Sequence, residues 1–264
     1  MRLEGFIDGV GFLGPGLDNW PHAAEILRGA KAYLPAPTVL PLPAMLPPAE
    51  RRRTGRIVKL ALAVAMEATT RAGVDPLQVP SVFSSSSGDG HICHEICQAL
   101  ALPGREVSPT RFSKSVHNVA AGYWSIATGS MMESNVLCAF DASYIAGLLD
   151  AMTQISVDRR AVLLVAYDTE YPPPLHAKRP IPDALGVAML LTPEKTAKSL
   201  ARIAVAFTDE AADEMPDAGL EALRTAIPAA RSLPLLRLLA TGSKGRAILD
   251  YLDTSRAAVE VEPC

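Results

Sequence analysis

The sequence lacks a strong charge bias, long hydrophobic runs and a large number of cysteines. Its 25 Lys and Arg residues nearly balance 28 Asp and Glu residues, so no basic surface is expected to attract nucleic acid. No stretch approaches the ~18 apolar residues that mark a membrane-spanning helix. Four cysteines in 264 residues do not form a disulfide framework. A nucleic-acid partner, a membrane span and a disulfide-stapled fold are therefore not expected.

The rest of the composition is typical of a soluble α/β protein. Hydrophobic residues make up 49% of the chain and charged residues 20%, which is enough to bury a sizeable core. The N-terminal stretch MRLEGFIDGVGF carries three charges and no long apolar segment, so it predicts a first strand and not a signal peptide. These features favour a cytoplasmic protein.

Strand and helix patterns alternate along most of the chain. Prolines crowd residues 30–48, which predicts an extended surface segment. A helix is expected over 54–72, and a strand, a glycine turn and a helix over 79–101. Further strands are expected at 161–167, 185–191 and 202–207. We predict one domain over residues 1–208, followed by an appendage over 209–264 with a helix near 218–239 and a possible strand pair within 245–261.

The most informative segment is residues 108–151, where two helix patterns flank a short strand pattern. The first helix pattern spans 116–129 and places Val116, Val119 and Tyr123 on one face. An apolar run over 135–140 predicts a strand, and a second helix is expected over 142–155. Asp141 therefore lies at a strand-to-helix turn, where the N–H groups of the new helix favour negative charge.

This segment resembles the ketoacyl-synthase superfamily, whose members have the thiolase fold. In that family an Asn-x-x-Ala-Gly helix start, a strand and a nucleophile at the start of a buried helix follow one another. Aligning Asn118 to Gly122 with that pattern puts Asp141 where those enzymes have a cysteine. The resemblance implies a thiolase-like half fold, a βαβαβ-rich mixed five-stranded sheet with helices on both faces.

The stretches SSSSGDGHICHEIC, SPTRFSKSVHNVAAGYWSIATGS and DASYIAGLLDA are similar to a short branch of that family. Its members are the ketoacyl-synthase-like N-terminal domain proteins called chain-length factors, found in gene sets for aryl-polyene pigments. The resemblance implies a heterodimer with a full-length ketosynthase, joined edge to edge through residues 135–140, with an acyl carrier protein reached through that partner.

Two features predict that the subunit has no condensing activity of its own. A carboxylate at position 141 is a weak nucleophile toward a thioester, and we expect Asp141 to cap its helix by accepting from Ser143 or Tyr144 N–H. Ketoacyl synthases also use histidines from their C-terminal half, whereas residues 177–264 contain none. That stretch is also too short for a second thiolase half.

In such a heterodimer the growing acyl chain passes toward the subunit boundary. The residues predicted to line a tunnel or the interface come from the helix pattern and from the strand before the turn. They are Phe112, Val116, His117, Asn118, Val119, Tyr123, Leu137 and Phe140. The same helix face could instead be ordinary core. His117 and Asn118 are expected to orient the start of the helix.

Other constellations leave alternatives open. Ser115, His117 and Asp141 suggest a hydrolase triad, although no G-x-S-x-G occurs. Cys138 lies in the apolar run and is expected to be a buried structural thiol. A stand-alone acyl-transfer or thioester-hydrolysing enzyme using Cys138, or Ser115 with His117, is the alternative to the silent subunit.

No cofactor or metal site is expected. His91, Cys93, His94 and Cys97 have metal-ligand residue types, but their helical spacing does not converge on a tetrahedron, so ordinary buried cysteines are favoured. The glycine turn at 87–90 lacks the Lys-Ser/Thr of a P-loop and the spacing of a dinucleotide loop. The arginines at 51, 52, 53 and 56 could dock an acidic carrier protein or could simply be a solvated helix start.

Overall fold

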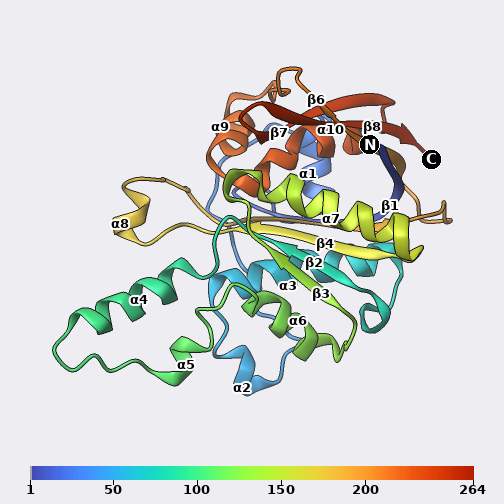
Figure 1. The fold of residues 1–264 in the computed structure, drawn as a ribbon. Coiled ribbons are helices and arrows are strands. Elements are labelled where there is room, and N and C mark those ends of the chain that lie inside the picture. Colours follow the sequence, from blue (N-terminus) through green and yellow to red (C-terminus); the bar gives the residue numbers. More distant parts are fainter. Residues whose placement is uncertain (1) are drawn as a thin grey trace.

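One eight-stranded mixed sheet runs through the computed structural model, which describes residues 2–264. Its strand order is β3-β2-β4-β5-β1-β6-β8-β7 (Figure 1). Strand β2 pairs in parallel with β3 and β4, and all other pairs are antiparallel. The strands are β1 (Arg2–Leu13), β2 (Ser81–Ser84), β3 (Ser134–Leu137), β4 (Val162–Asp168), β5 (Leu185–Thr192), β6 (Ala201–Thr208), β7 (Gly245–Leu252) and β8 (Ser255–Pro263).

Helices cover both faces of this sheet. They are α1 (Trp20–Leu27), α2 (Pro48–Arg51), α3 (Arg56–Ala72), α4 (Gly90–Ala101), α5 (Pro109–Phe112), α6 (Val119–Thr128), α7 (Ser143–Asp158), α8 (Pro173–His176), α9 (Ala218–Ala226) and α10 (Leu233–Thr241). One-turn 3₁₀ helices are η1 (Pro76–Gln78), η2 (Phe140–Ala142) and η3 (Pro228–Ser232). The predicted α/β class is confirmed. None of the helices in residues 2–264 is both long and apolar enough to cross a bilayer.

Two hydrophobic cores result, one on each face. Along β4, Leu164 and Ala166 belong to the core that contains residues of α1, α7, α9 and α10, whereas Leu163 and Val165 belong to the core that contains residues of α3 and α6. The alternation follows from the two-residue period of a strand. Helix α3 lies so close to β1 that there is no room for a side chain at Gly11. A Cβ there would overlap the carbonyl oxygen of Val64.

The sheet has more strands than the five expected. Strand β6 nevertheless matches the strand expected at 202–207, and the possible strand pair within 245–261 corresponds to β7 and β8, which continue the same sheet. Strand β8 pairs with β6 along its length, with Ala201 opposite Pro263 at one end and Thr208 opposite Arg256 at the other. The tail is therefore joined to the main sheet by hydrogen bonds. The boundary between residues 208 and 209 stays a prediction.

The single helix expected near 218–239 is two helices. Helix α9 ends at Ala226 and α10 begins at Leu233, with η3 between them. The reason is Pro228, which disfavours the α conformation of the residue before it. Ile227 is accordingly extended, with φ −118° and ψ 119°.

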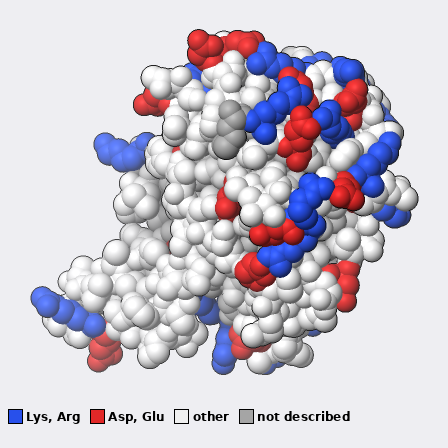
Figure 2. Space-filling view, turned by 45° about the vertical axis from the view of Figure 1, so that its right-hand side comes forward, with Lys and Arg blue, Asp and Glu red and all other residues white. Residues whose placement is uncertain are grey.

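The surface of β1, β6 and β8 carries paired charges of both signs. Arg2 binds Glu4 and Glu260, and Arg202 binds Glu4 and Glu262. Figure 2 shows blue and red side chains interspersed in a band on this face. These exposed pairs neutralise one another locally, and each contributes little to stability.

Helices α4 and α5 lie apart from the sheet, at the lower left of Figure 1. Helix α4 has an apolar side but no buried residue. Cys93 and Cys97 are therefore exposed, and the expectation of buried cysteines is wrong. The periodicity of apolar residues predicts that a helix has an apolar side, but it does not predict whether another part of the chain packs against that side.

Candidate functional site

The strand-to-helix turn that contains Asp141 is shorter and tighter than expected. Strand β3 ends at Leu137, and η2 precedes α7. Phe140 has a positive φ of 51°, a conformation that bulky residues rarely adopt. The buried Ser143 side chain holds the turn: its hydroxyl accepts from Ala139 N–H (3.0 Å) and donates to the Phe140 carbonyl (2.7 Å).

Asp141 does not cap α7, and the expectation of an N-cap is wrong. Ala142 occupies the N-cap position, and no side chain caps this helix. Because η2 intervenes, Asp141 lies one residue too early to serve as the cap. Its carboxylate instead forms ion pairs with Arg179 and Arg231. Arg231 donates to the carboxylate at 3.1 Å and to the backbone carbonyl of Asp141 at 3.0 Å.

Arg179 ties the β4–β5 connection to this turn. Its guanidinium lies over the Phe140 ring, 3.7 Å from the ring centroid, and donates to the Tyr171 hydroxyl at 3.2 Å. Both arginine side chains are 18% exposed, whereas the Asp141 side chain is 40% exposed. The carboxylate thus neutralises two half-buried cations. It acts as a hydrogen-bond acceptor in both ion pairs, and Asp141 has no thiol or hydroxyl group that could serve as a nucleophile.

A second carboxylate, Asp168 at the end of β4, lies buried behind the turn. It accepts from Ser86 N–H (2.8 Å) and from Ala229 N–H (2.9 Å), joining the end of β2 to η3. Burial raises the pKa of Asp168 to about 6, although these bonds and the nearby Arg179 act in the opposite direction. Because Ser86 Oγ lies 3.2 Å from the Tyr171 hydroxyl, the polar contacts run from Asp168 through Ser86 and Tyr171 to Arg179 and Asp141.

Sequence reasoning found Asp141 but missed the groups that surround it. Arg179 and Arg231 lie 38 and 90 residues away along the chain, and nothing in the sequence connects them with Asp141. Asp168 did carry a signal, because an acidic residue directly after an apolar strand is often buried at the end of that strand.

The residues of the alternative enzyme do not assemble. Ser115 Oγ donates to the Phe112 carbonyl at 2.8 Å, and within residues 2–264 no hydrogen bond joins Ser115, His117 and Asp141. His117 is half-buried, burial lowers the pKa of its imidazole, and Nε2 has no hydrogen-bond partner among the described residues.

Cys138 follows β3 and is exposed, so the expectation of a buried thiol is wrong. The strand contains four residues, not six, which leaves Cys138 in the turn. Its Sγ lies 3.2 Å from the Ser86 carbonyl oxygen. In the part of the chain that the structure describes, no three His, Cys, Asp or Glu side chains are grouped to hold a metal ion.

The residues predicted to line a tunnel or interface divide into two groups. Helix α6 begins at Val119, not at Val116, because residues 113–118 form turns. Val119 and Tyr123 are buried in the core beside α3. Phe112 and Val116 therefore do not share a helical face with them, and Asn118 makes no side-chain cap. The exposed apolar residues are Phe112 (64% exposed), Val116 (42%) and Phe140 (60%), and Leu137 is half-buried at the end of β3.

A cavity of about 760 Å³ opens beside Asp141, between the turn and the β7–β8 hairpin. Its walls carry Arg231, Asp250, Asp253 and Arg256 besides Asp141. Asp250 is ion-paired with Arg224, whose side chain is only 9% exposed. An acyl chain needs apolar walls, so this polar cavity is a poor candidate for a tunnel.

Comparison with solved structures shows the same fold in ketosynthase systems. A chain of the complex of ketosynthase ApeO with its chain length factor ApeC from Xenorhabdus doucetiae is 23% identical, with 98% of this chain and 99% of that chain covered and a TM-score of 0.74. A chain of the ishigamide ketosynthase/chain length factor is 15% identical, with 99% of both chains covered and a TM-score of 0.71. The Burkholderia phymatum STM815 beta-ketoacyl synthase is 15% identical over 91% of this chain and 71% of that chain, with a TM-score of 0.58.

These matches confirm the thiolase-like fold. No curated protein matches the sequence. The family model for the beta-ketoacyl synthase N-terminal domain, however, matches residues 19–244, which is most of the chain. The protein belongs to the beta-ketoacyl synthase N-terminal domain family.

Proposed function

We propose that this protein is a non-catalytic, chain-length-factor-like subunit that pairs with an active β-ketoacyl synthase. It would act in type II fatty-acid or polyketide-like biosynthesis, of the aryl-polyene kind, and shape the acyl tunnel at the heterodimer interface. The observation that carries the proposal is the carboxylate of Asp141, which is bound by Arg179 and Arg231 at the position where the sequence resemblance places the family's nucleophile. A carboxylate held in two ion pairs is a poor nucleophile toward a thioester.

The matched structures support a subunit role. This chain covers 99–100% of chains from complexes described as ketosynthase with chain length factor, or as a type II acyl carrier protein with its ketosynthase. It covers 71% of the Burkholderia beta-ketoacyl synthase. Residues 177–264 contain no histidine, so they do not supply the histidines that the resemblance assigns to the C-terminal half of the condensing enzymes.

Strand β3 supports an edge-to-edge interface. It forms one end of the sheet, where its outer backbone groups have no neighbouring strand within residues 2–264. A partner strand would satisfy them and remove an open edge. The exposed Phe112, Val116 and Phe140 are apolar side chains of the kind that a partner subunit covers.

Any contact with a carrier protein is proposed to run through the partner. Three of the four arginines at positions 51, 52, 53 and 56 are already engaged: Arg51 donates to the carbonyls of Ala44 and Leu46, Arg53 binds Glu50, and Arg56 binds Glu170 and Asp183. This part of the surface therefore offers little free positive charge to an acidic carrier.

The test is to purify the protein alone and together with a co-expressed ketosynthase. Alone, it should neither take up a labelled acyl group from acyl carrier protein nor decarboxylate malonyl carrier protein, and with the ketosynthase it should elute as a heterodimer on sizing. Stable acyl transfer to the isolated chain would refute the silent-subunit proposal. If that transfer were lost in Cys138→Ala, the alternative enzyme would replace it.

A further inference from the structure

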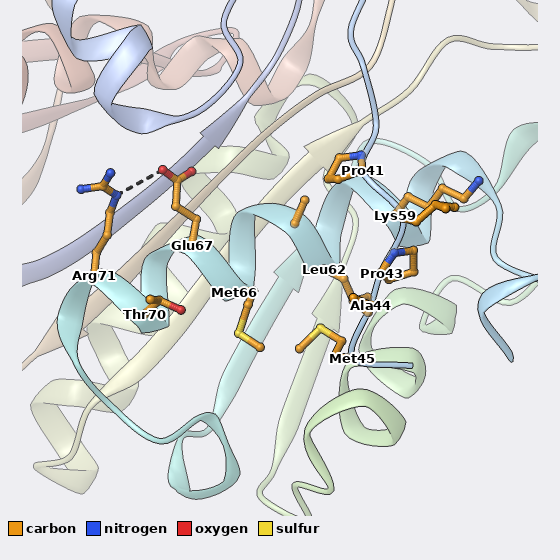
Figure 3. Close-up of a pocket in the computed structure, with 12 residues that line it drawn as sticks. Pro41, Pro43, Ala44, Met45, Lys59, Leu62, Met66, Glu67, Thr70 and Arg71 are labelled. Carbon is orange, nitrogen blue, oxygen red and sulfur yellow. Dashed lines mark hydrogen bonds and ion pairs between the residues drawn. The ribbon is translucent and has the colours of Figure 1, made fainter. Parts of the chain in front are cut away.

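A second cavity lies on the outer side of α3, on the opposite face of the sheet from α7. It has a volume of about 580 Å³ and lies between α3 and the extended segment over residues 41–45 (Figure 3). Helix α3 supplies one wall, from Lys59 at one end through Met66 to Arg71 at the other, and the extended segment supplies the opposite wall, which includes Met45.

The outer wall of this cavity is fixed at both ends, so the cavity is preformed. On one side, Thr38 N–H donates to Asp183 Oδ2 (2.6 Å) and its hydroxyl donates to the Ala184 carbonyl (2.8 Å). On the other side, Arg51 donates to the carbonyls of Ala44 (2.7 Å) and Leu46 (3.0 Å). Prolines between these anchors restrict the backbone further.

The walls are long and mostly apolar. Lys59 and Arg71 are twelve residues apart on α3, which corresponds to roughly 18 Å along the helix. Between them lie Leu62, Ala63 and Met66, and in Figure 3 Met66 and Met45 extend toward each other from opposite walls. Methionine side chains adapt to ligands of varying shape, and a long, narrow apolar groove fits a linear chain better than a compact ring.

The charges at the two ends differ, which gives the groove a direction. At one end Arg71 is paired with Glu67 at 3.1 Å. The Glu67 carboxylate also accepts from the N–H groups of Phe12 and Trp20, each at 3.0 Å, so this end already contains a fixed anion. At the other end Lys59 is half-buried and forms no ion pair with any residue in 2–264. An anionic group is favoured at Lys59 and disfavoured beside Glu67.

We propose that this groove binds a linear amphiphile with one negative charge, of the fatty-carboxylate class. The carboxylate lies at the Lys59 ammonium, and the alkyl chain runs along α3 between Met45 and Met66 toward Thr70. This site is separate from the Asp141 turn, and the inference does not depend on the proposed catalytic silence or on a ketosynthase partner.

Methyl-labelled methionine NMR on the full-length protein tests the site directly. Titration with decanoate should shift the Met45 and Met66 methyl signals saturably, with Met45→Leu and Met66→Leu identifying them. The methyl signals of Met152 and Met189, which are buried in the core on the other face, should stay in place. Absence of a Met45 and Met66 response, or an equal response at Met152 and Met189, overturns the proposal.

Two variants test the orientation of the ligand. Lys59→Gln should weaken decanoate binding about tenfold, measured by calorimetry, and should leave binding of the neutral decanol unchanged. Lys195→Gln is the matched control, because Lys195 is exposed and lies outside the groove. Ala63→Phe should block both ligands by filling the groove, and Ala63→Leu replaces it if the larger side chain prevents folding. Undiminished decanoate binding in Lys59→Gln refutes the assigned orientation.

Discussion

Replacing Asp168 by Asn should change how the stability of the protein depends on pH. Asp168 is 2% exposed, and burial raises the pKa of its carboxyl from 3.8 to about 6. A rise of about 2 pKa units corresponds to about 3 kcal/mol of unfolding free energy. Below about pH 4 the carboxyl is protonated in both states and has no effect. At pH values between the pKa of the unfolded chain and that of the folded protein, the Asp168 carboxyl keeps its proton only in the folded protein. Stability therefore falls as pH rises through this range, and the full loss is present above about pH 6.

The measurement is urea unfolding of both proteins at several pH values between about pH 5 and about pH 8. Relative to Asp168→Asn, the wild type should lose about 1 kcal/mol of stability between about pH 5 and about pH 6, and the loss should level off above that. The difference in unfolding free energy between the two proteins at a single pH is not the test. It also includes a lost hydrogen bond, because Ser86 N–H and Ala229 N–H bind different carboxylate oxygens and Asn has only one oxygen. The test is how that difference in unfolding free energy changes with pH.

Glu221→Gln provides a control of the opposite sign. The hydrogen bond from Arg224 lowers the pKa of Glu221 below 4.5, so the stability that Glu221 contributes is present above the unfolded pKa and is lost only as pH falls through the folded pKa. Its difference from wild type should be flat between about pH 5 and about pH 8. A flat profile for Asp168→Asn as well would refute the reasoning, because it would mean that the Ser86 and Ala229 bonds and Arg179 outweigh desolvation and keep the carboxylate ionised.

Three further predictions concern the turn and the interface. Asp141→Asn should destabilise the fold by about 1 to 2 kcal/mol in thermal unfolding, because the half-buried Arg179 and Arg231 lose their counter-charge. Asp141→Cys should still take up no acyl group. Uptake by that variant would show that only the thiol is missing. Leu137→Lys at the β3 edge should abolish co-elution with the ketosynthase, whereas Leu252→Lys on β7, at the opposite edge of the sheet, should not; equal effects would place the interface elsewhere. Tyr123→Ala should cost about 3 to 5 kcal/mol as a core truncation, and Phe112→Ala, which is exposed, should leave the melting temperature unchanged and lengthen the products of the heterodimer if it limits the tunnel; unchanged products would remove Phe112 from the tunnel.

Local patterns in the sequence predict the elements of this fold better than their packing. The short apolar runs at 161–167 and 185–191 predict β4 and β5 closely, because continuous apolar runs of this length are typical of strands buried on both faces. The start of α6 is less predictable, since Val116 fits the helical spacing but lies in the turns before Val119. Helix α4 has the period of a packed helix and no packing partner. Pro228 is different, because it carried a local signal that splits the expected C-terminal helix.

The site depends on contacts that no local pattern contains. The position of Asp141 follows from the order of a helix, a strand and a second helix within about thirty residues, so sequence reasoning could find it. The state of its carboxylate does not follow, because it is set by Arg179 in the β4–β5 connection and by Arg231 in η3. An isolated Asp at such a turn would be expected to cap the helix. With two guanidinium groups within reach, the carboxylate gains more from charge-assisted bonds than from a backbone N–H. The Asp141 carboxylate thus connects three segments of the chain, the turn before α7, the β4–β5 connection and η3, and this gives Asp141 a structural role whether or not a partner subunit is bound.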